Sequence, residues 1–331
     1  MVRVAINGFG RIGRMVFRAG YNDPDIEWIA FNDLTDPKTL ANLLKYDSVH
    51  GKFKGEVGYT DHSLIINGRE IKVFAEKDPE KLPWRELNID VVVESTGFFR
   101  TQELASKHLT AGAKKVLLSA PAKGEGEVKT IVLGVNEHAY DKQNDHLISN
   151  ASCTTNCFAP VAKVFNDNYG INRGFMVTVH GYTADQRIVD GPHKDLRRAR
   201  AAAVNIVPTS SGAAIAVEKV IPDLKGRLHS EAMRVPVLDG SIIYFVCELN
   251  KTPSAHEVND LFRNVAQNHL KGILEYTDEP IVSTDVLGNP HSCIFDASLT
   301  EVDNNMLKVV AWYDNEWGYS WRMVDMIKLL L

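Results

Sequence analysis

Several features that mark special classes of protein are scarce in this chain of 331 residues. It has only four cysteines, too few for a disulfide framework. No apolar run approaches the roughly 18 residues that a membrane-spanning helix needs. The 37 lysines and arginines are outnumbered by 42 acidic residues, so at a net charge of −5 a general nucleic-acid or membrane-surface binder is not expected. The N-terminus leads into a strand pattern without a signal-peptide layout. We therefore expect a cytoplasmic protein.

The first half of the chain alternates short apolar strands with helical stretches, which predicts an α/β domain with a parallel sheet. A strand over 2–6 runs into Asn7-Gly8-Phe9-Gly10-Arg11-Ile12-Gly13-Arg14 and then into a helix. This is GxGxxG in the context of a dinucleotide site. Gly8 permits the tight turn, Gly10 lets a pyrophosphate approach the backbone, and Gly13 lets the helix close on the strand. The N–H groups at the helix start would bind the phosphates.

An acidic residue follows the second expected strand. This strand covers 28–32 and ends at Asp33, 20 residues after Gly13. An acid in this position binds the ribose hydroxyls of adenosine and repels a 2′-phosphate. Asp33 therefore favours NAD over NADP.

Further strands of the first half end in small polar residues. Asn67-Gly68 predicts a hairpin over 63–73, and buried strands are expected over 90–97 and 115–121. Ligands of open parallel sheets lie beyond the carboxyl ends of the strands. The candidate cofactor neighbours at these ends are Ser95, Thr96, Gly97 and Ser119. The same residues would also suit ordinary turns.

The second half has a different pattern, with strands expected over 174–180, 241–248, 292–297 and 306–312 and few helices between them. This arrangement predicts an α+β domain with a largely antiparallel sheet and helices on one face. Cys247 and Cys293 lie inside these strand patterns, so we expect both in the core.

A cysteine among small polar residues stands between the two halves, in Ser149-Asn150-Ala151-Ser152-Cys153-Thr154-Thr155-Asn156-Cys157-Phe158. The N–H groups at a helix start carry partial positive charge, so a thiol there ionises more easily, and the thiolate is the reactive form. His180, at a strand end, is a candidate base, because nucleophile and base need only be adjacent in space. The alternatives are a cysteine that caps a buried helix and a structural histidine.

Cationic residues cluster in the second half. The segment 193–200 holds His193, Lys194, Arg197, Arg198 and Arg200, a high density for an acidic protein. It could bind phosphate, or it could form a solvated or subunit-contact face. Arg234 adds a cation just ahead of a strand, and 210–214 has hydroxyls at an expected helix start, which suits a phosphate.

Four motifs together resemble the phosphorylating glyceraldehyde-3-phosphate dehydrogenases. They are the glycine motif over 7–14, Ser152-Cys153-Thr154-Thr155-Asn156-Cys157, Thr178-Val179-His180 and Trp312-Tyr313-Asp314-Asn315-Glu316. The similarity extends over essentially the whole chain, and the cysteine motif is far more specific than the glycine motif. The resemblance implies a Rossmann NAD-binding domain over 1–152, completed by a C-terminal helix over about 316–331, and a catalytic domain over 153–315. It also implies a homotetramer in which 181–205 packs beside a neighbour's cofactor site.

The resemblance further implies an activity and residue roles. Glyceraldehyde 3-phosphate would be oxidised to 1,3-bisphosphoglycerate with NAD and inorganic phosphate, through a thiohemiacetal and a thioester on Cys153, with His180 as the base. Together with the glycine motif and the strand ends, it gives a cofactor-binding set of Gly8, Gly10, Arg11, Ile12, Gly13, Asp33, Ser95, Thr96, Ser119 and Asn315. The implied phosphate-binding set is Ser152, Thr154, Thr183, Arg198, Ser211, Gly212 and Arg234. No metal is expected, because the sequence shows no ligand cluster.

The chain departs from the family pattern at three places. Ser211 replaces a common threonine and keeps the hydroxyl. Val237-Leu238-Asp239-Gly240 replaces the usual Thr-Pro-Asn-Val, and the sequence gives no account of the effect. Gly191 stands where NAD-specific members usually carry a leucine that helps to exclude the 2′-phosphate, whereas Pro192 and Asp33 are choices of the NAD type. We expect a preference for NAD that does not exclude NADP.

Other functions compete with this interpretation. Erythrose-4-phosphate dehydrogenase shares the cysteine and glycine motifs but differs in the phosphate segment over 208–214, and Asn315-Glu316-Trp317-Gly318 occurs in both groups. A zinc-dependent dehydrogenase would need a ligand cluster. A pure binding module would keep its function after Cys153 is blocked. The cluster over 194–200 leaves room for weak nucleic-acid binding at most.

Overall fold

The computed structural model describes residues 1–124 and 126–331, and these form two compact units. The first unit contains Met1–Ile131, His138–Ala151 and Ser320–Leu331. The second contains Val132–Glu137 and Ser152–Tyr319. The C-terminal residues therefore return to the first unit after the chain has built the second.

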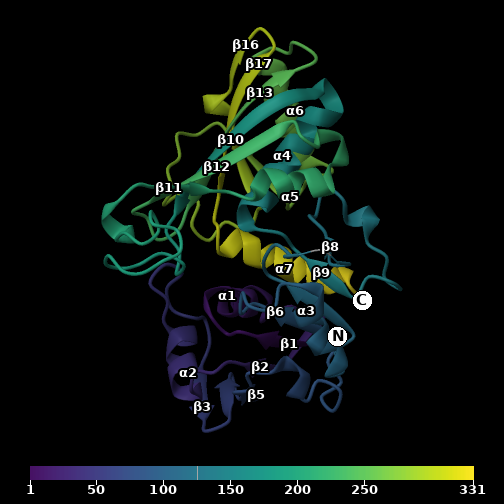
Figure 1. Ribbon diagram of the computed structural model, residues 1–331, viewed down its shortest axis with the longest axis vertical. Helices are drawn as coiled ribbons and strands as arrows, with labels where there is room; N and C mark the ends of the chain where they lie inside the picture. Colours follow the sequence, from purple (N-terminus) through teal and green to yellow (C-terminus); the bar gives the residue numbers. More distant parts are fainter. Residues whose placement is uncertain (125) are drawn as a thin grey trace. The chain divides into compact units, whose positions relative to one another are not determined.

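A nine-stranded sheet forms the centre of the first unit, in the order β3-β4-β5-β2-β1-β6-β7-β9-β8 (Figure 1). The strands are β1 (Val2–Asn7), β2 (Ile26–Asn32), β3 (Val57–Thr60), β4 (Ser63–Ile66), β5 (Arg69–Phe74), β6 (Val91–Glu94), β7 (Lys115–Leu118), β8 (Lys129–Thr130) and β9 (Leu147–Ser149). From β5 to β8 every neighbouring pair is parallel, and only the β3-β4-β5 edge is antiparallel.

Helices α1 (Arg11–Gly20), α2 (Pro37–Lys45), α3 (Gln102–Thr110) and most of α7 (Trp317–Leu329) belong to this unit, with the 3-10 helix η1 (Pro79–Lys81). A further 3-10 helix, η2 (Glu137–Ala139), crosses the boundary in sequence between the units. Helix α7 packs beside α1, where a Cβ on Gly20 would lie 3.1 Å from a methyl carbon of Val324 (Figure 1). The C-terminal helix therefore lies close to the end of the first helix of the unit.

Local sequence explains why these elements form. The three consecutive valines of β6 are fully buried, as expected for a parallel strand that is covered on both faces. Asp36 caps α2 by accepting a hydrogen bond from the backbone N–H of Thr39 at 2.9 Å. Asn67 and Gly68 have φ of 48° and 79°, the left-handed pair that a two-residue hairpin turn requires. The hairpin predicted from the sequence is therefore confirmed.

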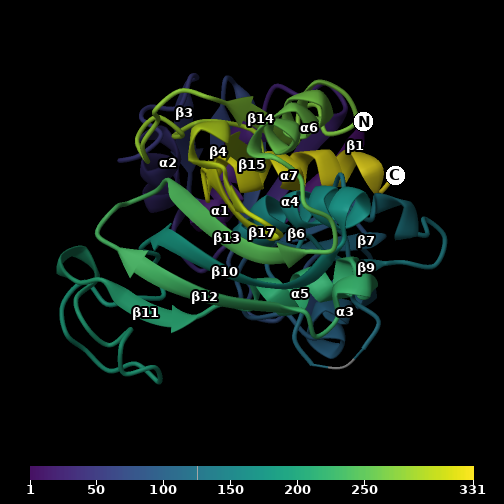
Figure 2. The same ribbon diagram turned by 90° about the horizontal axis from the view of Figure 1, so that it is seen from above.

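An eight-stranded sheet organises the second unit, in the order β11-β12-β10-β13-β17-β15-β14, with β16 paired to β17 (Figure 2). The strands are β10 (Ile171–Gly181), β11 (Val207–Ser210), β12 (Leu228–Val235), β13 (Ser241–Leu249), β14 (Leu274–Thr277), β15 (Cys293–Asp296), β16 (Glu301–Asp303) and β17 (Met306–Tyr313). The helices are α4 (Cys153–Tyr169), α5 (Ala213–Val220) and α6 (Ala255–Gln267), with the 3-10 helices η3 (Ala202–Val204), η4 (Pro222–Leu224) and η5 (Ala297–Leu299). Among the described strands of this sheet, only β10–β12 and β14–β15 are parallel pairs.

Aromatic side chains join the helices to one face of this sheet. On α4, Phe158 meets Phe245 of β13 with ring centroids 4.8 Å apart. On α6, Phe262 stacks on Phe295 of β15 at 3.9 Å. Cys247 and Cys293 are also buried, as predicted. The core of the second unit thus lies between the sheet and α4 and α6.

The predicted architecture, a parallel sheet followed by a mostly antiparallel one, is confirmed. Helix α4 begins at Cys153, because Ser152 caps it and accepts a hydrogen bond from the N–H of Thr155 at 3.1 Å. Within the described residues, no helix combines the length and the apolar composition that crossing a membrane requires.

Candidate active site

Cys153 is the first residue of α4 and is half-buried. The chain enters this helix through Ala151, whose φ of 55° is uncommon for a residue with a side chain. The hydroxyl of Ser152, a predicted phosphate ligand, is used as the N-cap. The thiol therefore stands at the positive end of a 17-residue helix whose start is fixed by its neighbours.

His180 lies near the end of β10 and faces the thiol, with Nε2 3.5 Å from Sγ of Cys153. The parallel register pairs His180 with Arg234 on β12. The Nδ1 atom of His180 is 2.7 Å from the carbonyl oxygen of Gly181 and 2.5 Å from Nη1 of Arg234, which also donates to Gly181 O at 3.0 Å. The carbonyl oxygen calls for a hydrogen on Nδ1, whereas the guanidinium, which can only donate, calls for a lone pair there, so the two contacts favour opposite tautomers. With the hydrogen on Nδ1, Nε2 can accept the thiol proton.

Burial controls the charge of this pair. It lowers the pKa of His180 to about 3, and the positive charge of Arg234 acts in the same direction. Burial also raises the pKa of the Cys153 thiol, and Arg234 opposes that rise. The sequence predicted an easily ionised thiol from the helix start alone, whereas burial acts on the thiol in the opposite direction. Burial thus disfavours the charged form of both groups, and His180 is the neighbour placed to accept the thiol proton.

Tyr313, at the end of β17, connects α4 with β10. Its hydroxyl lies 3.0 Å from Oγ1 of Thr154 and 2.8 Å from Oγ1 of Thr178. Its ring meets His180 edge-on, with centroids 5.9 Å apart. The hydroxyl of Thr154, a predicted phosphate ligand, therefore points to Tyr313. Sequence reasoning gave Tyr313 no role, although its place beside Asn315 in the motif over 312–316 was the available signal.

Asn315 is buried just after β17, and its amide orientation is set by Ser241. The hydroxyl of Ser241 donates to Oδ1 of Asn315 at 2.5 Å and accepts from the N–H of Gly181 at 3.2 Å. Because Oδ1 accepts this hydrogen bond, Nδ2 is the group that Asn315 presents as a donor to a ligand. Ser241 was not singled out from the sequence, because only its register opposite Tyr313 brings it here.

The departure at 237–240 places a second acid beside a buried one. Asp239 accepts hydrogen bonds from the N–H groups of Gly240 at 2.8 Å and Asn315 at 3.2 Å. Asp314 accepts from the N–H of Trp317 at 2.6 Å, and its carboxyl also hydrogen-bonds Asp239. Burial and the adjacent Asp239 raise the pKa of Asp314 to about 8. A bond between two carboxyl groups requires a proton, so Asp314 keeps one at neutral pH.

The predicted cations of the second unit differ in how they are held. Arg234 lies beside His180, as described above. Arg198 donates from Nε to Thr209 at 2.9 Å and from Nη1 to Asp185 at 2.5 Å, so an acid neutralises part of its charge. Thr183 lies partly exposed after the end of β10. The structure thus brings Arg234, but not the whole basic segment, against the thiol–imidazole pair.

Ser211 and Gly212 precede α5, as the sequence predicted. The Ser211 hydroxyl accepts from the N–H of Ala213 at 3.2 Å, and the Ser230 hydroxyl accepts from Ala214 at 3.0 Å. Gly212 is exposed. The start of α5 is therefore lined with hydroxyls, two of which already hold helix N–H groups.

In the first unit, the three glycines of the motif differ in the space around them. Gly8 has φ of 91°, and a Cβ there would lie 2.7 Å from the backbone nitrogen of Thr96. A Cβ on Gly13 would lie 2.2 Å from the carbonyl oxygen of Gly8. No described atom comes within 4 Å of a Cβ placed on Gly10. Gly8 and Gly13 thus allow close packing, and Gly10 leaves open space at the start of α1 that suits a pyrophosphate.

Asp33 and Arg11 flank this turn. Asp33, at the end of β2, accepts from the N–H of Phe9 at 2.8 Å. Arg11 binds Asp47 with both nitrogens, at 2.9 and 3.3 Å. Burial of Asp47 acts to raise its pKa, but hydrogen bonds from the His50 N–H and Arg11 lower it to about 2. The Arg11 side chain is therefore structural, while Arg11 and Ile12 supply backbone to the first turn of α1.

The strand-end candidates also gather beside the glycine turn. Ser95 donates to the carbonyl oxygen of Gly8 at 2.6 Å, and Thr96 follows it. Ser119, after β7, donates its N–H to the carbonyl oxygen of Glu94 at 2.9 Å. Phe98 is 79% exposed, although it is a large aromatic residue. Sequence reasoning missed Phe98, and an aromatic residue directly after a strand-end glycine was the signal available.

Comparison with known proteins gives a consistent result. The family model "Glyceraldehyde 3-phosphate dehydrogenase, NAD binding domain" matches residues 2–102, and "Glyceraldehyde 3-phosphate dehydrogenase, C-terminal domain" matches residues 152–315. The chain is 58% identical over 326 residues to glyceraldehyde-3-phosphate dehydrogenase of Geobacillus stearothermophilus, covering 98% of this chain and 97% of the relative. It is 57% identical to glyceraldehyde-3-phosphate dehydrogenase 1 of Bacillus subtilis, with the same coverage. To glyceraldehyde-3-phosphate dehydrogenase 2 of Trichormus variabilis it is 53% identical over 334 residues, covering 100% and 98%.

Proposed function

Because the chain belongs to the glyceraldehyde-3-phosphate dehydrogenase family, we propose that Cys153 and His180 catalyse its NAD-dependent dehydrogenation of glyceraldehyde 3-phosphate. The family and the NAD cofactor predicted from the sequence are confirmed. The observation that carries the assignment of the catalytic pair is the 3.5 Å separation of Sγ and Nε2 at the start of α4.

The reaction follows from the chemistry of this pair. Nε2 of His180 accepts the thiol proton, and the Cys153 thiolate forms a bond to the aldehyde carbon of the substrate. The oxyanion of the resulting thiohemiacetal develops beside the helix-start N–H groups. His180 returns its proton to this oxyanion, which becomes a hydroxyl, and then accepts the hydroxyl proton again as a hydride leaves the same carbon, which produces a thioester on Cys153. Inorganic phosphate then attacks the thioester and displaces Cys153 from the acyl carbon. The acyl phosphate that leaves the enzyme is 1,3-bisphosphoglycerate.

The residues of the first unit fit NAD, because the space at Gly10 opens directly onto the uncapped start of α1. NAD accepts the hydride when it is bound. Gly8, Gly10, Arg11, Ile12 and Gly13 would hold its pyrophosphate. Asp33 would hold the adenosine ribose, and Ser95, Thr96 and Ser119 would line the remaining edge. Asn315 would donate from Nδ2 to the nicotinamide carboxamide, and Phe98 offers a face on which an adenine can stack.

Two phosphate sites are proposed around the thiol. Thr183 and Arg234 would hold the phosphate of the substrate, with Arg198 near both sites. Ser152, Thr154, Ser211 and Gly212 would hold the attacking phosphate. A phosphate on Arg234 would also draw the guanidinium away from Nδ1 of His180. That movement favours a hydrogen on Nδ1 and a basic Nε2.

We further propose that the units act as an NAD-binding domain over 1–152, completed by 316–331, and a catalytic domain over 153–315. A homotetramer is supported by exposed apolar side chains on the sheet of the second unit and on 181–206. They include Phe175, Met233, Tyr244, Val246, Ile188, Val189, Leu196, Val204 and Ile206. Four free thiols suit a reducing cytoplasm.

The test is NADH formation with glyceraldehyde 3-phosphate or erythrose 4-phosphate, in the presence and absence of inorganic phosphate. Phosphate-dependent turnover that prefers glyceraldehyde 3-phosphate and falls more than about a thousandfold in Cys153→Ser is expected. The matched control is Cys247→Ser, a buried thiol in β13, which should keep turnover. Faster oxidation of erythrose 4-phosphate would move the assignment to the alternative dehydrogenase.

A further inference from the structure

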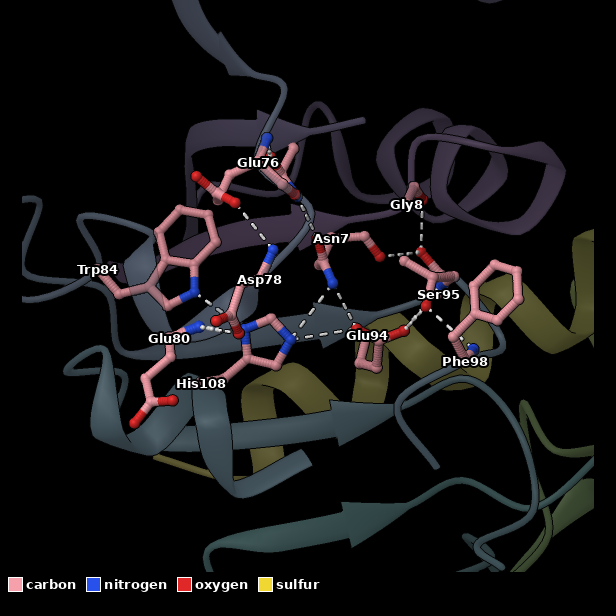
Figure 3. A network of polar contacts seen from close by, with 12 residues as sticks. Asn7, Gly8, Glu76, Asp78, Glu80, Trp84, Glu94, Ser95, Phe98 and His108 are labelled. Carbon is pink, nitrogen blue, oxygen red and sulfur yellow. Dashed lines mark hydrogen bonds and ion pairs between the residues drawn. The ribbon is translucent and has the colours of Figure 1, made fainter. Parts of the chain in front are cut away.

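A buried polar network lies at the carboxyl ends of β1, β2 and β6, and the reaction described above does not use it (Figure 3). Its side chains are Asn7, Asn32, Trp84, Glu94 and His108, each 4% exposed or less. Burying this many polar groups costs free energy unless each has its partner. The donor and the acceptor of each hydrogen bond in the network can therefore be assigned.

The direction of the hydrogen bonds begins at Trp84. Its indole Nε1–H can only donate, and it lies 3.0 Å from Nδ1 of His108. Nδ1 is therefore the acceptor, and the ring hydrogen of the neutral imidazole must be on Nε2. Nε2 lies 3.1 Å from Oε2 of Glu94 and donates to it.

Asn7 is oriented in the same way. Its Oδ1 accepts from Nδ2 of Asn32 at 2.6 Å, so the amide orientation is fixed. Its Nδ2 donates to Oε2 of Glu94 at 2.6 Å. The 3.3 Å approach of this Nδ2 to Nε2 of His108 joins two donors and is not a hydrogen bond.

The other oxygen of Glu94 reaches the turn that follows β6. Oε1 accepts from the backbone N–H of Thr96 at 2.8 Å and also from the Thr96 hydroxyl. The Thr96 hydroxyl in turn accepts from the N–H of Phe98 at 3.1 Å. Glu94 thus accepts four hydrogen bonds as a carboxylate, two from the network and two from the turn.

This turn is packed against the glycine turn. A Cβ added to Gly8 would lie only 2.7 Å from the backbone nitrogen of Thr96, so the two turns are in close contact. The Ser95 hydroxyl donates a hydrogen bond to the carbonyl oxygen of Gly8 at 2.6 Å. Gly8 itself follows Asn7 directly. The carboxylate of Glu94 is consequently bonded to both turns, through Asn7 on one side and Thr96 on the other.

We propose that Trp84, His108 and Glu94 form a one-way hydrogen-bond relay that positions the turns at Gly8 and Thr96 for NAD. Glu94 is the positioning residue of the relay. The proposal rests on the NAD site described above. It assigns the relay to cofactor affinity, because the turns that it holds carry the proposed NAD-binding residues of the first unit, whereas the thiol and the imidazole belong to the second unit.

Glu94→Gln tests the relay with little change in shape. An amide has one oxygen and one NH2 group, so one pair of donors, at Thr96 or at His108 and Asn7, must face another donor. We expect the Kd and the KM for NAD to rise about tenfold while kcat at saturating NAD stays within about twofold of the native enzyme. Calorimetric titration with NAD and steady-state kinetics measure both.

Lys115→Met is the matched control. Lys115 is a buried charged residue at the amino end of β7, in the same sheet, and its Nζ donates to two backbone carbonyls at 2.6 Å. It should lower the melting temperature without changing the KM for NAD. If Glu94→Gln lowers the melting temperature as Lys115→Met does and leaves the Kd for NAD unchanged, the network is only structural and the proposal is wrong.

A second measurement does not depend on NAD or on a folded variant. A neutron crystal structure of the native protein should show a hydrogen on Nε2 of His108 and none on Nδ1. A hydrogen on Nδ1 would overturn the relay. Loss of NAD binding by the native protein would instead contradict the proposed function, so the two failures are distinguishable.

Discussion

The cofactor edge of the first unit and the thiol–imidazole pair of the second unit are built in opposite ways. The cofactor edge uses backbone turns, glycines and a polar network in which each donor has a fixed acceptor. The catalytic pair is held by residues of α4, β10, β12 and β17, and burial disfavours the charged form of both side chains. The hydrogen bonds of the cofactor edge thus hold its turns in place, whereas the catalytic pair is arranged so that a proton can pass from Sγ to Nε2.

The largest effect should come from breaking the catalytic pair. His180→Asn removes the only group within 3.5 Å of Sγ that can accept the thiol proton among the described contacts. Since general-base catalysis supplies about 10²–10⁴-fold, we expect kcat to fall by that factor, and thiol alkylation at neutral pH to slow as well. Stopped-flow and iodoacetamide kinetics measure the two effects.

His229→Asn is the control for this prediction. His229 stacks on the exposed Phe175 at 5.0 Å, so its loss should leave kcat unchanged. Unchanged alkylation in His180→Asn would mean that the helix start, not the imidazole, activates Cys153.

The cofactor edge should respond to a single methyl group. Gly8→Ala places a Cβ 2.7 Å from Thr96 N at a φ of 91°, so we expect loss of about 2–4 kcal/mol of stability and of measurable NAD binding. Gly10→Ala meets no described atom within 4 Å, so it should melt like the native protein yet bind NAD weakly. Melting curves with and without NAD separate the two effects. Equal melting temperatures for the two variants would show that the backbone at Gly8 can shift to make room for the Cβ without a loss of stability.

The same contrast explains how much the sequence could predict. Local signals were sufficient for the glycine turn, the hairpin at Asn67-Gly68 and the strand ends, because each depends on neighbouring residues and on strand direction. The pairing of His180 with Arg234 depends on the register of β10 and β12, which nothing local specifies. The effect of burial on the pKa of the thiol depends on several elements that are distant in sequence, so reasoning from the helix start alone could not include it. The roles of Glu94 and Ser241 likewise depend on contacts between distant strands.

A smaller effect is expected at the buried acids near Asn315. The pKa of Asp314 is raised from 3.8 to about 8 in the folded state, so its contribution to stability is full below about pH 4 and is lost as the pH rises toward 8. Asp239→Asn keeps an oxygen for the Gly240 and Asn315 N–H groups and gives Asp314 an N–H donor. We expect the variant to gain on the order of 2 kcal/mol at pH 8 and little at pH 5.

Thermal melting over this pH range checks the prediction. The control is Asp285→Asn, an acid in an exposed turn whose carboxylate accepts from the Val282 N–H at 2.8 Å. It should show no gain at pH 8. A gain in Asp239→Asn that is equal at pH 5 and pH 8 would show that the two acids do not share a proton.

The smallest effect concerns cofactor choice at Gly191. A Cβ there would lie 3.7 Å from its nearest neighbours, Cδ of Arg187 and the carbonyl oxygen of Val189, which is ordinary contact, so the loop accepts a Cβ. If NADP can bind because position 191 lacks a leucine, Gly191→Leu should lower kcat/KM with NADP by about fivefold and leave kcat/KM with NAD unchanged. Asp33→Asn should shift the same ratio in the opposite direction, because it removes the charge that repels a 2′-phosphate. If Gly191→Leu leaves the ratio unchanged while Asp33→Asn moves it, the choice of cofactor is made entirely at the rigid edge of the first unit.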